Sequence, residues 1–316
     1  MGIADDFMSS FFEHYPEARS GKLSMEELNR LMAEFQHKGN NSPLDDFDGL
    51  SPAQMNVLLY EPLSGNCILQ FNRSMDQHLE EVPLLQLSEL LLMEIRDAGK
   101  LKLTVKGNLP VRVCELLYSQ QLIKWEYMEY MKRVREEDIP YIGPLKHYLL
   151  SQGIIKKRDN AFSLTEKGAE FLKESRAARF ISLFLFFAGR FHWGNFYGLQ
   201  DNGKCGQLGW AFSLVLLSKY GDKARESQIY SLKVMQAFEK ELWDTRGAKG
   251  KEEHILSYNR AYAVRFFDCF ANWFGLVNIE RKKNLSISFF DQRVVRKSEL
   301  FDQLFEPITD KSSNRG

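Results

Sequence analysis

Apolar residues recur at helical spacing along much of the chain, which predicts a mainly helical protein. The clearest stripe has four apolar residues spaced three or four apart: Leu84, Leu87, Leu91 and Ile95. Gly99 stops this run, and the next residues, LKLT, are too few for a helix and suit a short strand. A further stripe follows Pro110, so the expected order here is helix, strand, helix.

Two polar signals mark helix starts in the N-terminal part of the chain. In KLSMEEL, Ser24 and Glu27 have the spacing of a capping box, in which each side chain binds the backbone N–H of the other residue. In GLSPAQM, Ser51 and Gln54 repeat the pattern, with Pro52 at the first helical position. We therefore expect helices from about residues 25 and 52.

The middle of the chain predicts a helix followed by a β-hairpin. YIGPLKHYLLSQG forms a helical pattern closed by Gly153. The next stretch, IIKKRDNAFSLT, has two apolar runs on either side of the polar tip 157–160. Thr165 then has the position of a helix N-cap.

This succession across residues 84–175 resembles the winged-helix superfamily, with LLSQGIIKKRDNAFSLTEKGAEFL as third helix, wing and exit helix. The resemblance implies a fold rather than an activity. Residues 119–140, with the cluster WEYMEYM, are an insertion relative to a minimal winged helix. LSPAQMNVLLYEP and LKLTVKGNLP also resemble segments of a family of uncharacterised bacterial proteins, which implies no known activity.

The C-terminal part is strongly aromatic. Its most apolar run, 180–188, predicts a buried core helix, because it is far shorter than the roughly 20 residues that cross a bilayer. GLVNIERKKNLSISFF predicts a second hairpin with a basic tip at Arg281, Lys282 and Lys283. This part is a candidate second winged-helix-like unit.

The expected fold class is mainly α with small β-hairpins. The expected divisions are an acidic helical segment, a winged-helix-like domain, an aromatic-rich helical domain and a disordered tail, at 1–75, 76–178, 179–308 and 309–316.

Charge gives no overall field that would attract nucleic acid, since 42 basic and 42 acidic residues make the net charge zero. The distribution is uneven, however. Residues 1–50 hold ten acidic and four basic residues, net −6, and residues 141–180 hold eight basic and four acidic residues, net +4. An acidic head thus precedes a more basic centre.

The four cysteines are far apart and lack the spacing of a metal or disulfide site, so we expect buried thiols in a reducing cytosol. Acidic residues near the N-terminus oppose a secretory signal. We therefore predict a cytoplasmic protein without a membrane partner, cofactor or metal.

The basic tips are the candidate nucleic-acid-binding residues. In regulators of this fold the wing and the preceding helix approach DNA, with cations on phosphates. The candidates are Lys146, Lys156, Lys157, Arg158, Arg281, Lys282 and Lys283. The alternative is that these hairpin loops are polar only because they are solvated.

The densest set of reactive side chains lies in FHWGNFYGLQDNGKCG. As a pocket it would offer His192 as general base or Cys205 as nucleophile. The alternative is an aromatic connection packed over the core. The pocket candidates are His192, Trp193, Asn195, Tyr197, Asp201 and Cys205.

Together these patterns favour a non-enzymatic binding protein that contacts nucleic acid in a regulatory role. The alternative is a protein-interaction scaffold whose partner binds residues 119–140 or the acidic head. A third hypothesis is an enzyme with its site in residues 190–206, although no catalytic residue is assigned.

Overall fold

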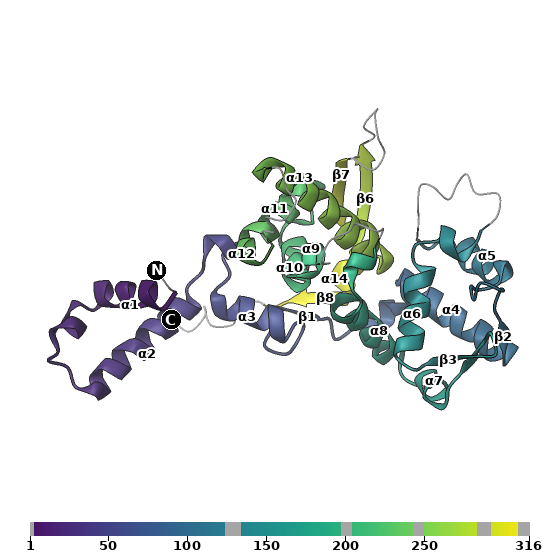
Figure 1. Ribbon diagram of the computed structural model, residues 1–316, viewed down its shortest axis with the longest axis horizontal. Coiled ribbons are helices and arrows are strands. Elements are labelled where there is room, and N and C mark those ends of the chain that lie inside the picture. Colours follow the sequence, from purple (N-terminus) through teal and green to yellow (C-terminus); the bar gives the residue numbers. More distant parts are fainter. Residues whose placement is uncertain (1–2, 124–133, 197–203, 243–249, 283–291, 309–316) are drawn as a thin grey trace.

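The computed structural model describes residues 3–123, 134–196, 204–242, 250–282 and 292–308. Within these ranges the chain is mainly helical with small antiparallel sheets of two or three strands, which confirms the fold class at that level. A helical hairpin lies at the N-terminal end of the molecule, away from the sheets (Figure 1). No helix in the described ranges is long and apolar enough to cross a membrane.

The N-terminal helices are α1 (Ile3–His14), α2 (Met25–Asn41) and α3 (Pro52–Tyr60), separated by the 3₁₀ helices η1 (Pro16–Ser20) and η2 (Asp45–Phe47). Two of them, α2 and α3, start where the sequence predicts, and α1 precedes them without a predicted start. Both capping boxes are present. Ser24 Oγ accepts from the Glu27 N–H at 3.2 Å, and Ser51 Oγ accepts from the Gln54 N–H at 3.3 Å.

The first unit, residues 83–171, is built around a three-stranded antiparallel sheet. After the 3₁₀ helix η3 (Met75–Glu81), it contains α4 (Pro83–Ala98), β2 (Leu101–Lys102), α5 (Val111–Ser119), η5 (Glu136–Asp138), α6 (Ile142–Ser151), β3 (Ile155–Arg158), β4 (Ala161–Leu164) and α7 (Glu166–Phe171). The strand order is β2–β4–β3. Strands β3 and β4 form the predicted hairpin, and its turn residues Asp159 and Asn160 have φ of 51° and 52°, as a tight hairpin turn requires.

A mostly buried connection follows the first unit. It comprises α8 (Arg176–Leu185), the π-helical η6 (Phe186–Arg190), the 3₁₀ helix η7 (Trp193–Asn195) and α9 (Lys204–Gln207). Phe180, Phe184 and Phe187 are fully buried, which confirms the predicted core helix over this run.

The second unit, residues 210–304, repeats the element order of the first. It contains α10 (Trp210–Tyr220), β5 (Arg225–Glu226), α11 (Ser227–Ala237), α12 (Glu239–Leu242), α13 (Lys251–Tyr262), the π-helical η8 (Ala263–Ala271), β6 (Val277–Lys282), β7 (Gln292–Lys297) and α14 (Glu299–Leu304). The strand order β5–β7–β6 matches that of the first sheet, because the short first strand again pairs with the third.

The second hairpin differs from its sequence prediction. Its returning strand is β7, Gln292–Lys297, and Arg281 and Lys282 lie within β6 instead of at a tip. Lys283 lies outside the described residues, as do much of the predicted insertion, 124–133, and the predicted tail, 309–316.

A two-stranded ladder joins distant parts of the chain. Strand β1 (Leu69–Phe71) pairs antiparallel with β8 (Phe305–Pro307), and the rings of Phe71 and Phe305 stack with centroids 5.5 Å apart. The described core is continuous from Met55 to Phe305, so both units and the connection share it.

Asp48 attaches the N-terminal segment to the second unit. Its carboxylate accepts a hydrogen bond from the Tyr220 hydroxyl at 2.9 Å and pairs with the ammonium groups of Lys219, at 2.8 Å, and Lys233. Burial acts to raise the pKa of Asp48, but the hydrogen bonds from these three residues outweigh it and hold the pKa below its ordinary value. The ionised carboxylate therefore stabilises this contact.

We expect Asp48→Asn to lower the free energy of unfolding by about 1–2 kcal/mol near neutral pH. Because the folded-state pKa is lowered, the contribution of Asp48 is complete above the pKa of the unfolded chain and is lost as pH falls through the folded-state value. Urea titrations of both proteins from about pH 7 to pH 3 should show the difference shrinking toward acid. A constant difference would mean that charge is not responsible.

Gly168 marks a close approach between α7 and the hairpin. A Cβ at this position would lie 2.0 Å from the carbonyl oxygen of Ile154, at the start of the hairpin. We expect Gly168→Ala to destabilise the protein by about 2–3 kcal/mol, since backbone cannot move aside cheaply. Gly143→Ala, in α6, is the matched control because nothing lies within 4 Å of its Cβ position. Equal urea midpoints for the two variants would contradict this packing.

Candidate functional site

The pairing of strands in the first unit places three cations on one face of its sheet. Lys102 and Arg158 both pair with Ala161, from opposite sides, and Lys156 pairs with Ser163. Paired residues share a face of an antiparallel sheet, so these five side chains lie on one face, where Ala161 is covered and only 7% exposed. The three cations are exposed. We call Lys102, Lys156 and Arg158 the basic face.

The opposite face of this sheet packs on the core and fixes the register. Leu101, Ile155 and Phe162 are at most 3% exposed. A slip of one residue would bury the cations and expose these apolar side chains, so the core itself holds the basic face outward.

The surroundings of the basic face are also mainly cationic. Lys100 and Lys106 are exposed beside β2. Lys157 pairs with Phe162 and so belongs to the opposite face, from which it reaches the turn at Gly107; its Nζ would lie 2.7 Å from a Cβ at that glycine. An acid, Asp159, lies at the hairpin turn; its Oδ2 is 3.6 Å from Arg158 Nε, and both side chains are about four-fifths exposed. A pair this exposed is weak and leaves Arg158 able to take another partner.

Lys146, in contrast, is engaged inside the protein. Its ammonium pairs with the Glu136 carboxylate, and the two side chains are only 17% and 9% exposed. The other oxygen of Glu136 accepts from the Leu109 N–H at 2.6 Å. Lys146 therefore ties η5 to α6 and does not extend the basic face.

The cations of the second hairpin do not join the first set. The buried carboxylate of Asp268 binds Arg293 Nη2 at 2.7 Å and Arg281 Nη2 at 3.2 Å. Lys282 is exposed, but the β6–β7 hairpin and the β3–β4 hairpin lie at opposite edges of the molecule (Figure 1). The two predicted basic tips thus have different environments and no common face.

The predicted pocket residues are divided between surface and core. Trp193 is fully buried, donates from Nε1 to the Phe187 carbonyl at 2.6 Å and contacts the Phe270 ring. Cys205 is buried and its Sγ donates to the Tyr258 carbonyl at 3.3 Å. His192 and Asn195 are exposed, whereas Tyr197 and Asp201 lie outside the described residues.

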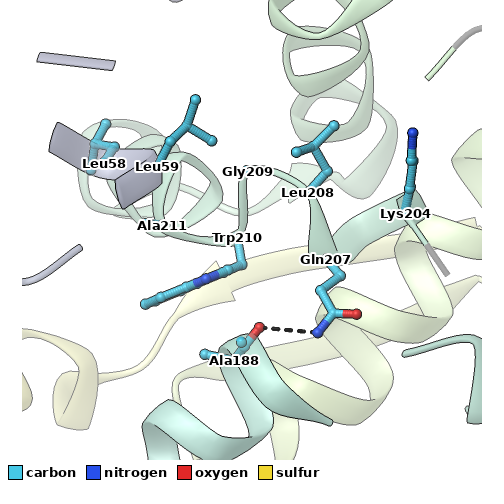
Figure 2. A pocket seen from close by; sticks show the side chains of 10 residues that line it. Leu58, Leu59, Ala188, Lys204, Gln207, Leu208, Gly209, Trp210 and Ala211 are labelled. Atoms are coloured by element: carbon cyan, nitrogen blue, oxygen red, sulfur yellow. Dashed lines mark hydrogen bonds between the residues drawn. The ribbon is translucent and has the colours of Figure 1, made fainter. Parts of the chain in front are cut away.

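A pocket of about 360 Å³ lies beside this segment, between α3, η6, α9 and α10. Figure 2 shows the Trp210 ring and Leu58 among its walls, with Lys204 extending away from Ala188. The Gln207 amide donates to the Ala188 carbonyl at 3.3 Å and to the Phe191 carbonyl at 2.7 Å. The pocket walls are mostly apolar, and the Gln207 amide is used in hydrogen bonds to the backbone. The residues that line this pocket therefore present no acid–base pair.

Thiol and metal chemistry receive no support from the described residues. Cys67, Cys114, Cys205 and Cys269 are buried, as predicted. Burial, with a smaller contribution from the nearby Glu136 charge, raises the pKa of Cys114 to about 12, which keeps it protonated. In the described ranges no three His, Cys, Asp or Glu residues come together as a metal site.

Sequence patterns identified Lys156 and Arg158 but missed Lys102. The signal that could have included it is the alternation in LKLT, which turns Lys102 away from the core. The partner of that strand comes some sixty residues later, and its register decides which cations are neighbours.

Comparison with models of known families, with curated proteins and with solved structures finds no match to this chain.

Proposed function

We propose that this chain is a winged-helix binding protein that contacts nucleic acid through the basic face of its first unit. The order helix, strand, helix, helix, hairpin, with the first strand beside the third, supports a winged helix in residues 83–171. Residues 210–304 have the same order, which supports a second such unit.

The observation that carries this proposal is the register that brings Lys102, Lys156 and Arg158 together on an exposed surface. Cations that neutralise phosphates release counterions, and this supplies most of the affinity of sequence-independent binding. A chain of zero net charge needs such a local concentration of cations to bind a polyanion.

The charges of the second unit are unfavourable for nucleic-acid contact, which leaves the first unit as the binding unit. Its helix α13 carries the exposed Glu252 and Glu253 in its first turn beside the exposed Lys251, so this end of the helix has a net negative charge, which repels phosphates. Arg281 and Arg293 are held by Asp268 beneath its sheet. We therefore assign nucleic-acid contact to one face of the molecule.

A salt titration tests the proposal. Fluorescence anisotropy of a labelled duplex, with folding of the protein confirmed by circular dichroism, should show binding at low ionic strength. Three phosphate contacts give a slope of about −3 in a plot of log affinity against log salt concentration. Folded protein that shows no affinity even at the lowest salt would exclude the proposal.

We expect Asp159→Asn to strengthen binding about two- to threefold, because it removes a negative charge beside Arg158. Asparagine tolerates the φ of 51° at this position, so the hairpin is preserved. The same anisotropy assay measures the change, with Asp302→Asn in the second unit as control. Unchanged affinity for Asp159→Asn would place Arg158 away from the phosphates.

A second candidate, a protein-interaction scaffold, is favoured by the N-terminal helical hairpin. Helix α2 spans 17 residues and buries none of them, and Met25 is 72% exposed. The hairpin extends from the rest of the molecule (Figure 1). Deleting residues 1–41 should abolish recovery of a protein partner in a pull-down and spare duplex binding. Recovery that survives the deletion would count against this candidate.

A further inference from the structure

The third helix of the first unit, α6, offers little for reading bases. In helix-turn-helix proteins one helix enters the major groove and presents several polar side chains to base edges. Of the ten residues of α6 only His147 and Ser151 are exposed. The remainder are buried or half-buried among η5, α8 and η6.

The two strongest polar side chains of α6, Lys146 and His147, are each held by contacts within the protein. Lys146 is neutralised by Glu136 in a pair that is mostly shielded from solvent. The His147 ring lies 6.0 Å and 5.9 Å from the rings of Phe186 and Phe191, centroid to centroid. Both phenylalanines are buried, so one side of the His147 ring rests on the core and the rest of the ring is exposed.

The basic face also lacks the features of a single-strand binder. Proteins that bind single strands stack bases on exposed aromatic rings. The aromatic residue of this sheet, Phe162, is 1% exposed and points into the core. Ala161 and Ser163 separate the cations instead, and neither can stack a base.

The spacing of the cations fits a phosphate backbone. Lys102 in β2 and Arg158 in β3 lie on either side of Ala161 in the central strand β4. Two strand spacings therefore separate their backbones, about 10 Å across the sheet. Long, exposed side chains at this separation can reach successive phosphates, and phosphate contacts carry no sequence information.

From these observations we infer that the first unit binds the phosphate backbone of a nucleic-acid duplex without regard to sequence. This inference rests on the proposed function and narrows it to one class of ligand. The contacting groups are Lys102, Lys156 and Arg158, and α6 serves as a support for the hairpin.

The test compares ligands of equal length: A·T-rich, G·C-rich and mixed DNA duplexes, an RNA duplex of mixed sequence, and a single strand. We expect the Kd values of the three DNA duplexes to agree within about threefold and to rise together with salt. The single strand should bind at least about threefold more weakly, for want of stacking. Comparison of the RNA duplex with the DNA duplex of mixed sequence shows which kind of duplex the protein binds more tightly.

The outcomes separate the inference from the proposed function. A preference of tenfold or more among the DNA duplexes, or tighter binding of the single strand, overturns the inference and leaves nucleic-acid binding intact. Failure of folded protein to bind any ligand at low salt overturns both.

The double variant E136Q/K146M provides an independent test. It removes the buried ion pair as a unit, and the amide oxygen that the E136Q change introduces can still accept from the Leu109 N–H. We expect its Kd for every duplex to stay within about twofold of wild type. A tenfold loss confined to one sequence would show that α6 reads bases and would overturn the inference.

Discussion

Reversing the charges of the basic face, in the variant K102E/K156E/R158E, is expected to weaken duplex binding at least about 100-fold at low salt. Three favourable phosphate contacts are lost, and three carboxylates then repel the same backbone. All three side chains are exposed, and their removal leaves the inward-facing residues of the sheet untouched. The fold should therefore survive, and anisotropy titration measures the loss directly.

The second unit supplies the matched control for this triple variant. Lys251, Lys282 and Arg296 are exposed there, and K251E/K282E/R296E changes the net charge by the same amount. We expect its Kd to rise less than about threefold, since only long-range repulsion is added and salt screens it. An equal loss in both triple variants would show that net charge rather than a particular face controls binding.

Asp268→Asn is expected to lower the free energy of unfolding by about 3–5 kcal/mol, the largest effect on stability that we predict. Asp268 is 1% exposed and binds Arg281 and Arg293, which lie on different strands of the second hairpin. Asparagine has the same shape but cannot balance the charges of the buried Arg293 and of Arg281, whose side chain is 15% exposed. Urea denaturation of the wild type and the variant measures the difference.

Asp302→Asn is the control for this prediction. Asp302 pairs with Lys297 at 2.7 Å but is 55% exposed, so its replacement should cost less than about 1 kcal/mol. If Asp268→Asn were as mild as Asp302→Asn, the ion pairs under the second sheet would contribute no more than a surface pair. The variant should still bind a duplex where it is folded, because the basic face lies on the first unit.

Elements determined by neighbouring residues could be predicted from the sequence. The capping boxes at Ser24 and Ser51 depend on contacts three residues apart, and the hairpin at 154–165 depends on a turn between two short apolar runs. Such contacts follow from local spacing, and no distant part of the chain has to be known.

Long-range pairing explains where the predictions differ from the structure. The sequence predicts a loop tip at Arg281 and Lys282, yet both residues lie in β6, which pairs with β7, where Val295 is fully buried. In this pairing Arg281 meets Asp268 beneath the sheet. The local sequence around Arg281 does not indicate this contact, because Asp268 lies on another element, η8.

The same limit applies to the reactive segment around His192. Phe191, Trp193 and Phe196 are buried, so these rings face the core, whereas His192 and Asn195 are exposed. The many reactive side chains in this short segment suggested a pocket, but the burial of its aromatic rings decides which side chains face the core. Trp193 consequently packs in the core, against the Phe270 ring.

The ladder between β1 and β8 has a consequence for biosynthesis. A ribosome makes Leu69–Phe71 long before Phe305–Pro307, so β1 has no partner strand while the two units emerge. Closure of this ladder must then be a late event, after both hairpins are able to form. A nascent chain halted before Phe305 would leave an open strand edge, the kind of surface that chaperones bind and that promotes aggregation.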